Sequence, residues 1–233
     1  CNVLDVNENF QIITRNNITY ALDIVTHDEY EIPQYSEIID FRNGVFICKS
    51  TYGPNVGKYF LIGKHCQQYA GEYFQRIDFL KKSLSYKSFS YKYWYAVATD
   101  ARGKKRYIGD LAELLLYKGK KLSSYHDFNE CCEICYMHDG RWYAIVLEGE
   151  VGGVIGNFAE EEMVAGKALS EHKFRSIGDV YDIPNHNRPY HAQRIYYEAN
   201  GKWWAKVRYV GEDSFGYIGT FADEEKYQGK SLS

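Results

Sequence analysis

Short apolar runs rich in aromatic and β-branched residues recur along this chain, and polar or glycine-bearing stretches separate them. The clearest begin at Trp94, Trp142 and Trp203, and each is followed by a glycine-bearing turn and a second apolar run that ends in Ile-Gly. This pattern predicts pairs of antiparallel strands. In two places an earlier strand precedes the tryptophan and joins it through Asp139-Gly140 or Asn200-Gly201, dipeptides that favour two-residue hairpin turns.

Each Ile-Gly begins a second shared pattern. The glycine is followed by an N-capping residue, an acidic residue three positions later, a further glycine and finally Leu-Ser. Capping residues and first-turn acids favour the start of a helix, and glycine commonly ends one. We therefore expect two-turn helices, each ending at the second glycine. They are predicted at about residues 111–118, 158–165 and 221–228.

These shared patterns constitute an internal repeat. The expected unit has three antiparallel strands and a short helix. A degenerate copy lies upstream, with Phe46 in the tryptophan position, Gly63 after the last strand and a longer helical candidate at about 65–79. The sequence thus predicts a β-rich α+β protein of about four tandem units. The expected divisions are an N-terminal hairpin region at 1–35, a degenerate repeat at 36–85, a basic repeat at 86–123, an acidic repeat at 124–170, and a C-terminal repeat with a long loop at 171–233.

Aromatic residues make up 17% of the chain, enough for several small packed cores. A tryptophan that recurs at one structural position indicates packing, so Trp94, Trp142 and Trp203 are expected inside. Trp204 has the opposite strand phase and is predicted to be a surface aromatic and a binding candidate. No run of 18 apolar residues occurs, so the sequence predicts no membrane span.

Charge differs sharply between the predicted repeats. Residues 86–123 carry nine Lys and Arg against three Asp and Glu, whereas residues 124–170 carry two against nine. The other two regions are nearly balanced, and the whole chain has a net charge of −3. The repeats therefore share the residues that favour folding and differ at their surfaces, which suits either a different ligand for each unit or neighbouring units that pack charge against charge.

Six cysteines are present, among them Cys132 and Cys135 in a C-x-x-C pair with His138 nearby. A second pair of zinc ligands at the usual spacing is missing, so no metal is predicted. The sequence leaves open whether a disulfide forms. Cys48 and Cys66 are a candidate pair if their strands are neighbours. Cys1 resembles a lipidated mature N terminus, although a processed secreted chain or an arbitrary boundary would give the same sequence. The compartment is left open, with an extracytoplasmic or cell-surface location favoured.

Common catalytic and nucleotide-binding motifs are absent from the sequence, and no cofactor is predicted. The densest group of catalytic-type side chains contains His186, Arg188 and His191. A hydrolase centred on residues 186–194 would use a histidine as general base and an arginine to stabilise an anion. The pattern places no nucleophile or carboxylate beside them, so a polar binding loop is the alternative interpretation.

The stretch from Gly201 to Glu225 resembles, over some 25 residues, the three-stranded sheet and helix of AP2-type and integrase-arm DNA-binding domains. The run from Asp139 to Val146 is similar to the Trp-Tyr hairpin of Tudor and other SH3-like barrels. The first resemblance implies nucleic-acid binding through a basic sheet surface. Only the basic repeat has the charge for it, with Arg102, Lys104, Lys105 and Arg106 in a predicted hairpin turn.

The interpretation that the sequence favours is a non-enzymatic binding protein built of tandem β-rich repeats, with a protein or carbohydrate partner. Small repeated units offer extended surfaces more often than deep catalytic pockets. A nucleic-acid-binding protein that uses residues 102–106 is the first alternative, and the hydrolase is the second.

Overall fold

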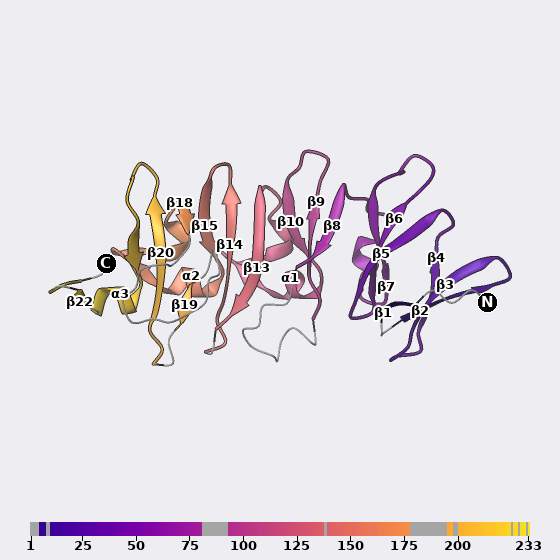
Figure 1. The fold of residues 1–233 in the computed structure, drawn as a ribbon, viewed down its shortest axis with the longest axis horizontal. Helices are drawn as coiled ribbons and strands as arrows, with labels where there is room; N and C mark the ends of the chain where they lie inside the picture. Colours follow the sequence, from indigo (N-terminus) through magenta and orange to yellow (C-terminus); the bar gives the residue numbers. More distant parts are fainter. Residues whose placement is uncertain are drawn as a thin grey trace. The chain divides into compact units, whose positions relative to one another are not determined.

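The structure is a computed structural model of a β-rich chain with several small antiparallel sheets (Figure 1). It divides into two compact units, the first formed by the described residues up to Leu80 together with 93–114, and the second by those from Leu115 onward. The structure describes residues 5–7, 10–80, 93–137, 139–177, 195–197, 200–224, 226–227, 229–231 and 233. Cys1 and the predicted binding residues His186, Arg188 and His191 lie outside this part.

The first unit contains one four-stranded and two three-stranded antiparallel sheets, with strand orders β1-β2-β3-β4, β5-β6-β7 and β10-β9-β8. A 3-10 helix, η1 (Gln67–Tyr69), and a short helix, α1 (Asp110–Leu114), complete it. The strands are β1 (Asp5–Asn7), β2 (Phe10–Arg15), β3 (Ile18–Asp23), β4 (Glu29–Ile32), β5 (Ser36–Arg42), β6 (Val45–Ser50), β7 (Tyr59–Gly63), β8 (Arg76–Phe79), β9 (Ala96–Thr99) and β10 (Lys105–Ile108).

Strand β6 is buried on both faces. Phe46 and Cys48 belong to a core with the first sheet, whereas Val45 and Ile47 belong to a second core that includes Trp94. Successive residues of a strand point to opposite faces, so a strand buried on both sides has a continuous apolar run rather than an alternating one. The Val45–Cys48 run therefore separates two small cores.

The second unit is built around a seven-stranded sheet, in which β21 pairs with β20 beside the main path β13-β14-β15-β18-β20-β19. In the described part of this unit, three two-stranded hairpins and four short helical elements accompany the sheet. The strands of the sheet are β13 (Glu130–Tyr136), β14 (Trp142–Glu148), β15 (Val151–Ile155), β18 (Phe174–Ile177), β19 (Tyr196–Tyr197), β20 (Trp203–Tyr209) and β21 (Gly216–Ile218). The helices are α2 (Asn157–Glu161), η3 (Leu169–Glu171) and α3 (Thr220–Glu224), to which η2 (Leu122–Ser124) adds a further 3-10 turn.

The core of the second unit lies where α2 and the sheet meet (Figure 1). Phe158 of α2 contacts Trp203 of β20 edge to face, with ring centroids 5.2 Å apart. The prediction that the recurring tryptophans pack inside is confirmed, because Trp94, Trp142 and Trp203 are at most 4% exposed. The indole Nε1 of Trp203 donates to Glu162 at 2.9 Å, so the buried ring has a partner for its polar atom.

The glycine of each Ile-Gly lies against the first residue of the tryptophan run. Gly109, Gly156 and Gly219 have φ values of 107° to 112°, which L side chains rarely adopt. A Cβ added to Gly109 would lie 2.6 Å from the carbonyl oxygen of Trp94 and 2.8 Å from the Cα of Tyr95. Only glycine permits this close approach, which explains why the three positions share it.

The helices after Ile-Gly are shorter than predicted. Each spans five residues, and α2 ends at Glu162, whose backbone is extended. The second glycine lies instead in the turn of a small hairpin, where Ala165 and Gly166 both have positive φ. The prediction that this glycine caps a helix is therefore wrong: two successive positive φ values define a two-residue hairpin turn. The hairpins join β11 (Leu116–Tyr117) to β12 (Lys120–Lys121), β16 (Met163–Val164) to β17 (Lys167–Ala168), and β22 (Lys226–Tyr227) to β23 (Lys230–Ser231).

The predicted N-capping residues tie each helix to its sheet. Asn157 Oδ1 accepts from the backbone amide of Trp142 at 2.8 Å, and Thr220 Oγ1 accepts from that of Trp203 at 3.1 Å. The N-cap position of α2 is Gly156, and no side chain caps it. These polar residues therefore satisfy the amide at the start of a strand, and Asn157 Oδ1 also accepts from the first-turn amide of Phe158 at 2.9 Å.

Two further expectations are corrected in the first unit. The helix predicted at about 65–79 is absent, since η1 covers only Gln67–Tyr69 and β8 begins at Arg76. Cys48 and Cys66 carry free thiols, so the candidate disulfide between them is not formed. Among the described residues, no helix has the length and apolar character to cross a membrane.

Candidate functional site

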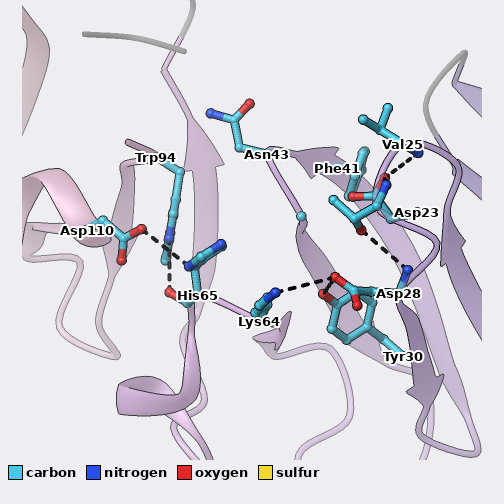
Figure 2. A pocket seen from close by; sticks show the side chains of 12 residues that line it. Asp23, Val25, Asp28, Tyr30, Phe41, Asn43, Lys64, His65, Trp94 and Asp110 are labelled. Carbon is cyan, nitrogen blue, oxygen red and sulfur yellow. Dashed lines mark hydrogen bonds and ion pairs between the residues drawn. The ribbon is translucent and has the colours of Figure 1, made fainter. Parts of the chain in front are cut away.

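A pocket of about 390 Å³ opens in the first unit (Figure 2). It lies at the ends of strands β3, β5, β7 and β10, where side chains from five segments of the chain come together. Such convergence of polar groups around a cavity is the usual starting point for a binding-site hypothesis. The polar and aromatic lining residues are Asp23, Asp28, Tyr30, Phe41, Asn43, Lys64, His65, Trp94 and Asp110.

One wall of the pocket is the loop between β3 and β4. Asp23, at the end of β3, is 5% exposed. Its Oδ1 accepts from the backbone amides of Val25 and Thr26 at 2.8 and 3.1 Å, which forms a tight turn. Its Oδ2 lies towards Gly44, since a Cβ there would be 3.9 Å from this oxygen. The loop is thus held by a buried carboxylate at the edge of the pocket.

Asp28, on the same loop, lies between two partners. Its Oδ2 is 3.8 Å from the Nζ of Lys64 and accepts a long hydrogen bond of 3.5 Å from the Tyr30 hydroxyl. Burial raises the pKa of Tyr30, and the negative charges of Asp28 and Asp23 raise it further. The tyrosine therefore stays protonated and offers a hydroxyl donor to the pocket.

The opposite wall of the pocket carries a histidine beside a carboxylate. His65 Nδ1 is 3.9 Å from Asp110 Oδ2, and the indole of Trp94 donates to the His65 carbonyl at 3.0 Å (Figure 2). Burial raises the pKa of Asp110 and outweighs His65 and Trp94, which lower it. The pocket therefore combines three carboxylates with one lysine and one histidine.

Cys66 follows His65 and lies near Asp110, an arrangement that invites comparison with a Cys-His-Asp triad. Its thiol is buried and donates to the carbonyl oxygen of Gly63 at 3.2 Å. Burial, followed by the charge of Asp110, raises its pKa to about 12. A nucleophilic cysteine needs a lowered pKa, so this thiol is a packing group.

The raised thiol pKa values predict that the first unit loses stability at high pH. Burial raises the pKa of both Cys48 and Cys66 to about 12. The folded state therefore holds protons that the unfolded state releases above about pH 9, and stability falls as the pH rises towards 12. The expected loss is about 1.4 kcal/mol per pH unit for each thiol. Urea midpoints between pH 8 and 11 should fall less steeply for a Cys48→Ala, Cys66→Ala double variant, and parallel profiles would contradict the assignment.

The basic residues predicted as binding candidates lie around the β9–β10 hairpin. Asp100 Oδ1 accepts from the backbone amides of Arg102 and Lys104 at 2.8 and 2.9 Å, so the turn is internally organised. Lys105 and Arg106 lie on β10. Arg106 donates to Glu72 at 2.6 Å and lies over the Phe74 ring. The structure brings the four residues to one hairpin, as predicted, and pairs Arg106 with an acid.

Trp204 does not provide the exposed aromatic face that its strand phase suggested. It is 2% exposed, and its ring lies 6.4 Å from those of Tyr217 and Phe221. The reason is that β20 is covered on both faces. The Trp204 side chain, on the face opposite Trp203, therefore packs in another buried region. This burial removes it from the surface that a ligand would meet.

The sequence did not predict that these residues form one pocket. Asp110 was read as a helix cap and His65 as part of a helix, and no spacing relates either to Asp23 or Asp28. Within the described residues, no group of three or more His, Cys, Asp or Glu is placed to hold a metal ion. A comparison with protein-family models and with curated proteins finds no match to this chain. The chemistry of the pocket is thus the basis on which a function is proposed.

Proposed function

We propose that this chain is a non-enzymatic binding protein made of tandem β-rich units, and that its pocket in the first unit takes a neutral carbohydrate. The observation that carries the proposal is the mixed lining of that pocket, in which carboxylates, a lysine, a histidine and an amide surround about 390 Å³. A cavity of this size suits one or two sugar rings.

Because the pocket is lined by both acidic and basic side chains, it favours an uncharged ligand. A phosphate or carboxylate would meet Asp23, Asp28 and Asp110, and an ammonium group would meet Lys64. A hydroxyl both donates and accepts, so a polyol can donate to the carboxylates and accept from Lys64 and the Asn43 amide. Neutral sugars carry such hydroxyls on every ring, which is why this class fits the lining best.

The same groups argue for binding rather than catalysis. Asp28 already faces Lys64 and the Tyr30 hydroxyl, and Asp110 lies beside the His65 ring. Cys66, the thiol beside the pocket, keeps its proton because its pKa is about 12. An acceptor-rich site without an activated nucleophile is suited to holding a ligand.

A recurring contact supports the tandem organisation. Trp94 donates its indole N–H to the backbone carbonyl of His65, and Trp203 donates to the side-chain carboxylate of Glu162; both acceptors follow the Ile-Gly of the preceding segment. Gly63 also repeats the close approach of Gly109, because a Cβ there would meet the backbone at Gly44 and Val45. These two contacts, one within each compact unit, are the kind that a nearest-neighbour arrangement of small repeats would make.

Carbohydrate binding can be tested with the full chain and a panel of neutral hexasaccharides, namely cellohexaose, maltohexaose and N-acetylchitohexaose. We expect calorimetry to detect at least one of them, and Asp28→Asn to weaken that binding by about tenfold, since charge-assisted hydrogen bonds to hydroxyls are lost. Asp78→Asn is the matched control, because Asp78 pairs with Arg76 on an exposed strand outside the pocket.

Three results would overturn the proposal. They are the absence of binding to every member of the panel and to a wider glycan array, the appearance of shorter sugars during incubation, and equal effects of Asp28→Asn and Asp78→Asn. Binding to DNA or RNA that weakens steeply with salt and with neutralisation of Lys104 would instead support the basic hairpin as the functional surface.

A further inference from the structure

Two exposed tyrosines lie side by side at the other end of the strands that form the pocket. Tyr35, in the turn between β4 and β5, and Tyr52, just after β6, have ring centroids 5.2 Å apart and an interplanar angle of 47°. They are 57% and 72% exposed. Large aromatic rings gathered in solvent signal a contact surface more often than a structural role.

Hydrogen bonds hold the backbone at both tyrosines. The amide of Thr51 donates to the Tyr35 carbonyl at 2.8 Å, and the Ser50 hydroxyl donates to the Tyr52 carbonyl at 3.0 Å. These bonds fix the Cα positions from which the side chains project. A preorganised pair of rings loses little conformational entropy when a ligand stacks on it.

The conformation of Tyr35 is a second, independent observation. Its φ is 63°, a left-handed value that is unusual for a bulky residue. Neighbouring hairpins of the same unit place Asn16-Asn17 and Asn43-Gly44 at positive φ, and those residue types tolerate it. A tyrosine at such a position adds strain without helping the turn, and strain of this kind gathers at ligand-binding positions.

A groove of about 580 Å³ begins at Tyr35. Its polar lining comes from Asn17, Thr19, Gln34, Ser36 and two glutamates, which supply amide, hydroxyl and carboxylate groups. The described lining contains no Lys, Arg or His. Such a groove disfavours phosphate and nucleic acid but offers partners to sugar hydroxyls.

We propose that Tyr35, Tyr52 and this groove form a second carbohydrate subsite, in which the tyrosine rings stack on the apolar face of a sugar. The inference rests on the proposed function, because it assigns the same ligand class to a second place in the unit. Strand β3 carries Thr19 at this end and Asp23 at the pocket, and four residue steps along a strand span about 13 Å. A glycan of several rings is therefore the ligand that matches both places.

The test uses the full chain and the hexasaccharide that binds best. Tyr52→Ala and Tyr35→Asn should each weaken binding by about tenfold, as removal of a stacking ring does at carbohydrate and nucleobase sites alike. Tyr52→Phe should retain affinity because the ring remains. Asparagine is chosen at position 35 because it tolerates positive φ. Tyr73→Ala is the matched control, since Tyr73 is 43% exposed beside Phe60 and outside the groove lining.

The outcomes separate this inference from the proposed function. If Tyr52→Ala and Tyr35→Asn bind like the parent while Asp28→Asn does not, the second subsite is wrong and the pocket stands. If no hexasaccharide binds the parent chain, the proposed function itself is wrong, and the subsite that rests on it falls with it. Equal losses for Tyr52→Ala and Tyr73→Ala would show a general effect on the unit, and would also overturn the subsite.

Discussion

Gly109→Ala is expected to lower the free energy of unfolding of the first unit by about 3–5 kcal/mol, enough to unfold many small domains. The added Cβ would lie 2.6 Å from the Trp94 carbonyl oxygen and 2.8 Å from the Tyr95 Cα, which are backbone atoms of the segment that leads into β9. The φ of 110° adds a conformational penalty. Urea denaturation followed by tryptophan fluorescence measures the change.

Gly103→Ala is the matched control for this prediction. Gly103 also has a positive φ, 78°, but a Cβ there meets nothing within 4 Å. The expected cost is about 1 kcal/mol, from backbone conformation alone. Comparable losses for the two variants would mean that the close approach at Gly109 is not what demands glycine.

Trp203→Ala is expected to destabilise the second unit by about 3–5 kcal/mol, the range for removing a large buried aromatic side chain. The residue is 1% exposed and contacts Phe158 in the core. Its loss leaves a cavity and removes the donor to Glu162. Thermal or urea unfolding monitored by far-UV circular dichroism reports the shift.

A second variant separates packing from hydrogen bonding. Trp203→Phe keeps an aromatic ring but leaves Glu162, which Arg141 also contacts at 2.7 Å, without its indole donor. We expect a cost of about 1.5–3 kcal/mol, because the bond is to a charged group. A Trp203→Phe variant as stable as the parent would refute the assigned role of the indole, and one as unstable as Trp203→Ala would assign the whole effect to the indole bond.

Local sequence patterns predicted the strands well. Asp139-Gly140 and Asn200-Gly201 lie in turns that precede β14 and β20, and β9, β14 and β20 follow the aromatic runs. These features depend on neighbours in the chain, since φ preferences and strand periodicity act over a few residues. The tryptophans were also placed correctly inside.

The pattern after Ile-Gly was misread because two local explanations compete. A glycine nine residues after a capping residue suits either the end of a helix or the turn of a hairpin, and both need positive φ. Ala165 beside Gly166 also adopts positive φ, which the sequence does not reveal. Tertiary contacts contributed to the outcome, since Asn157 accepts from the amide of Trp142 as well as from that of Phe158 in its own helix.

The pocket could not be anticipated from spacing. Asp28 and Lys64 are distant in the sequence, as are His65 and Asp110, and each pair meets only because neighbouring sheets end at one place. The exposed pair Tyr35 and Tyr52 depends in the same way on the β5–β6 pairing. Contacts between distant segments carry no local signature.

By itself the sequence determined that this is a β-rich chain with aromatic strands, glycine-bearing turns and a recurring tryptophan that packs inside. The tertiary structure alone decided which strands are covered on both faces, and therefore that Trp204 is buried while Tyr35 and Tyr52 are exposed. The physical reason is the separation along the chain over which each effect acts. Backbone preferences act between neighbours along the chain, whereas burial depends on which sheets pack together.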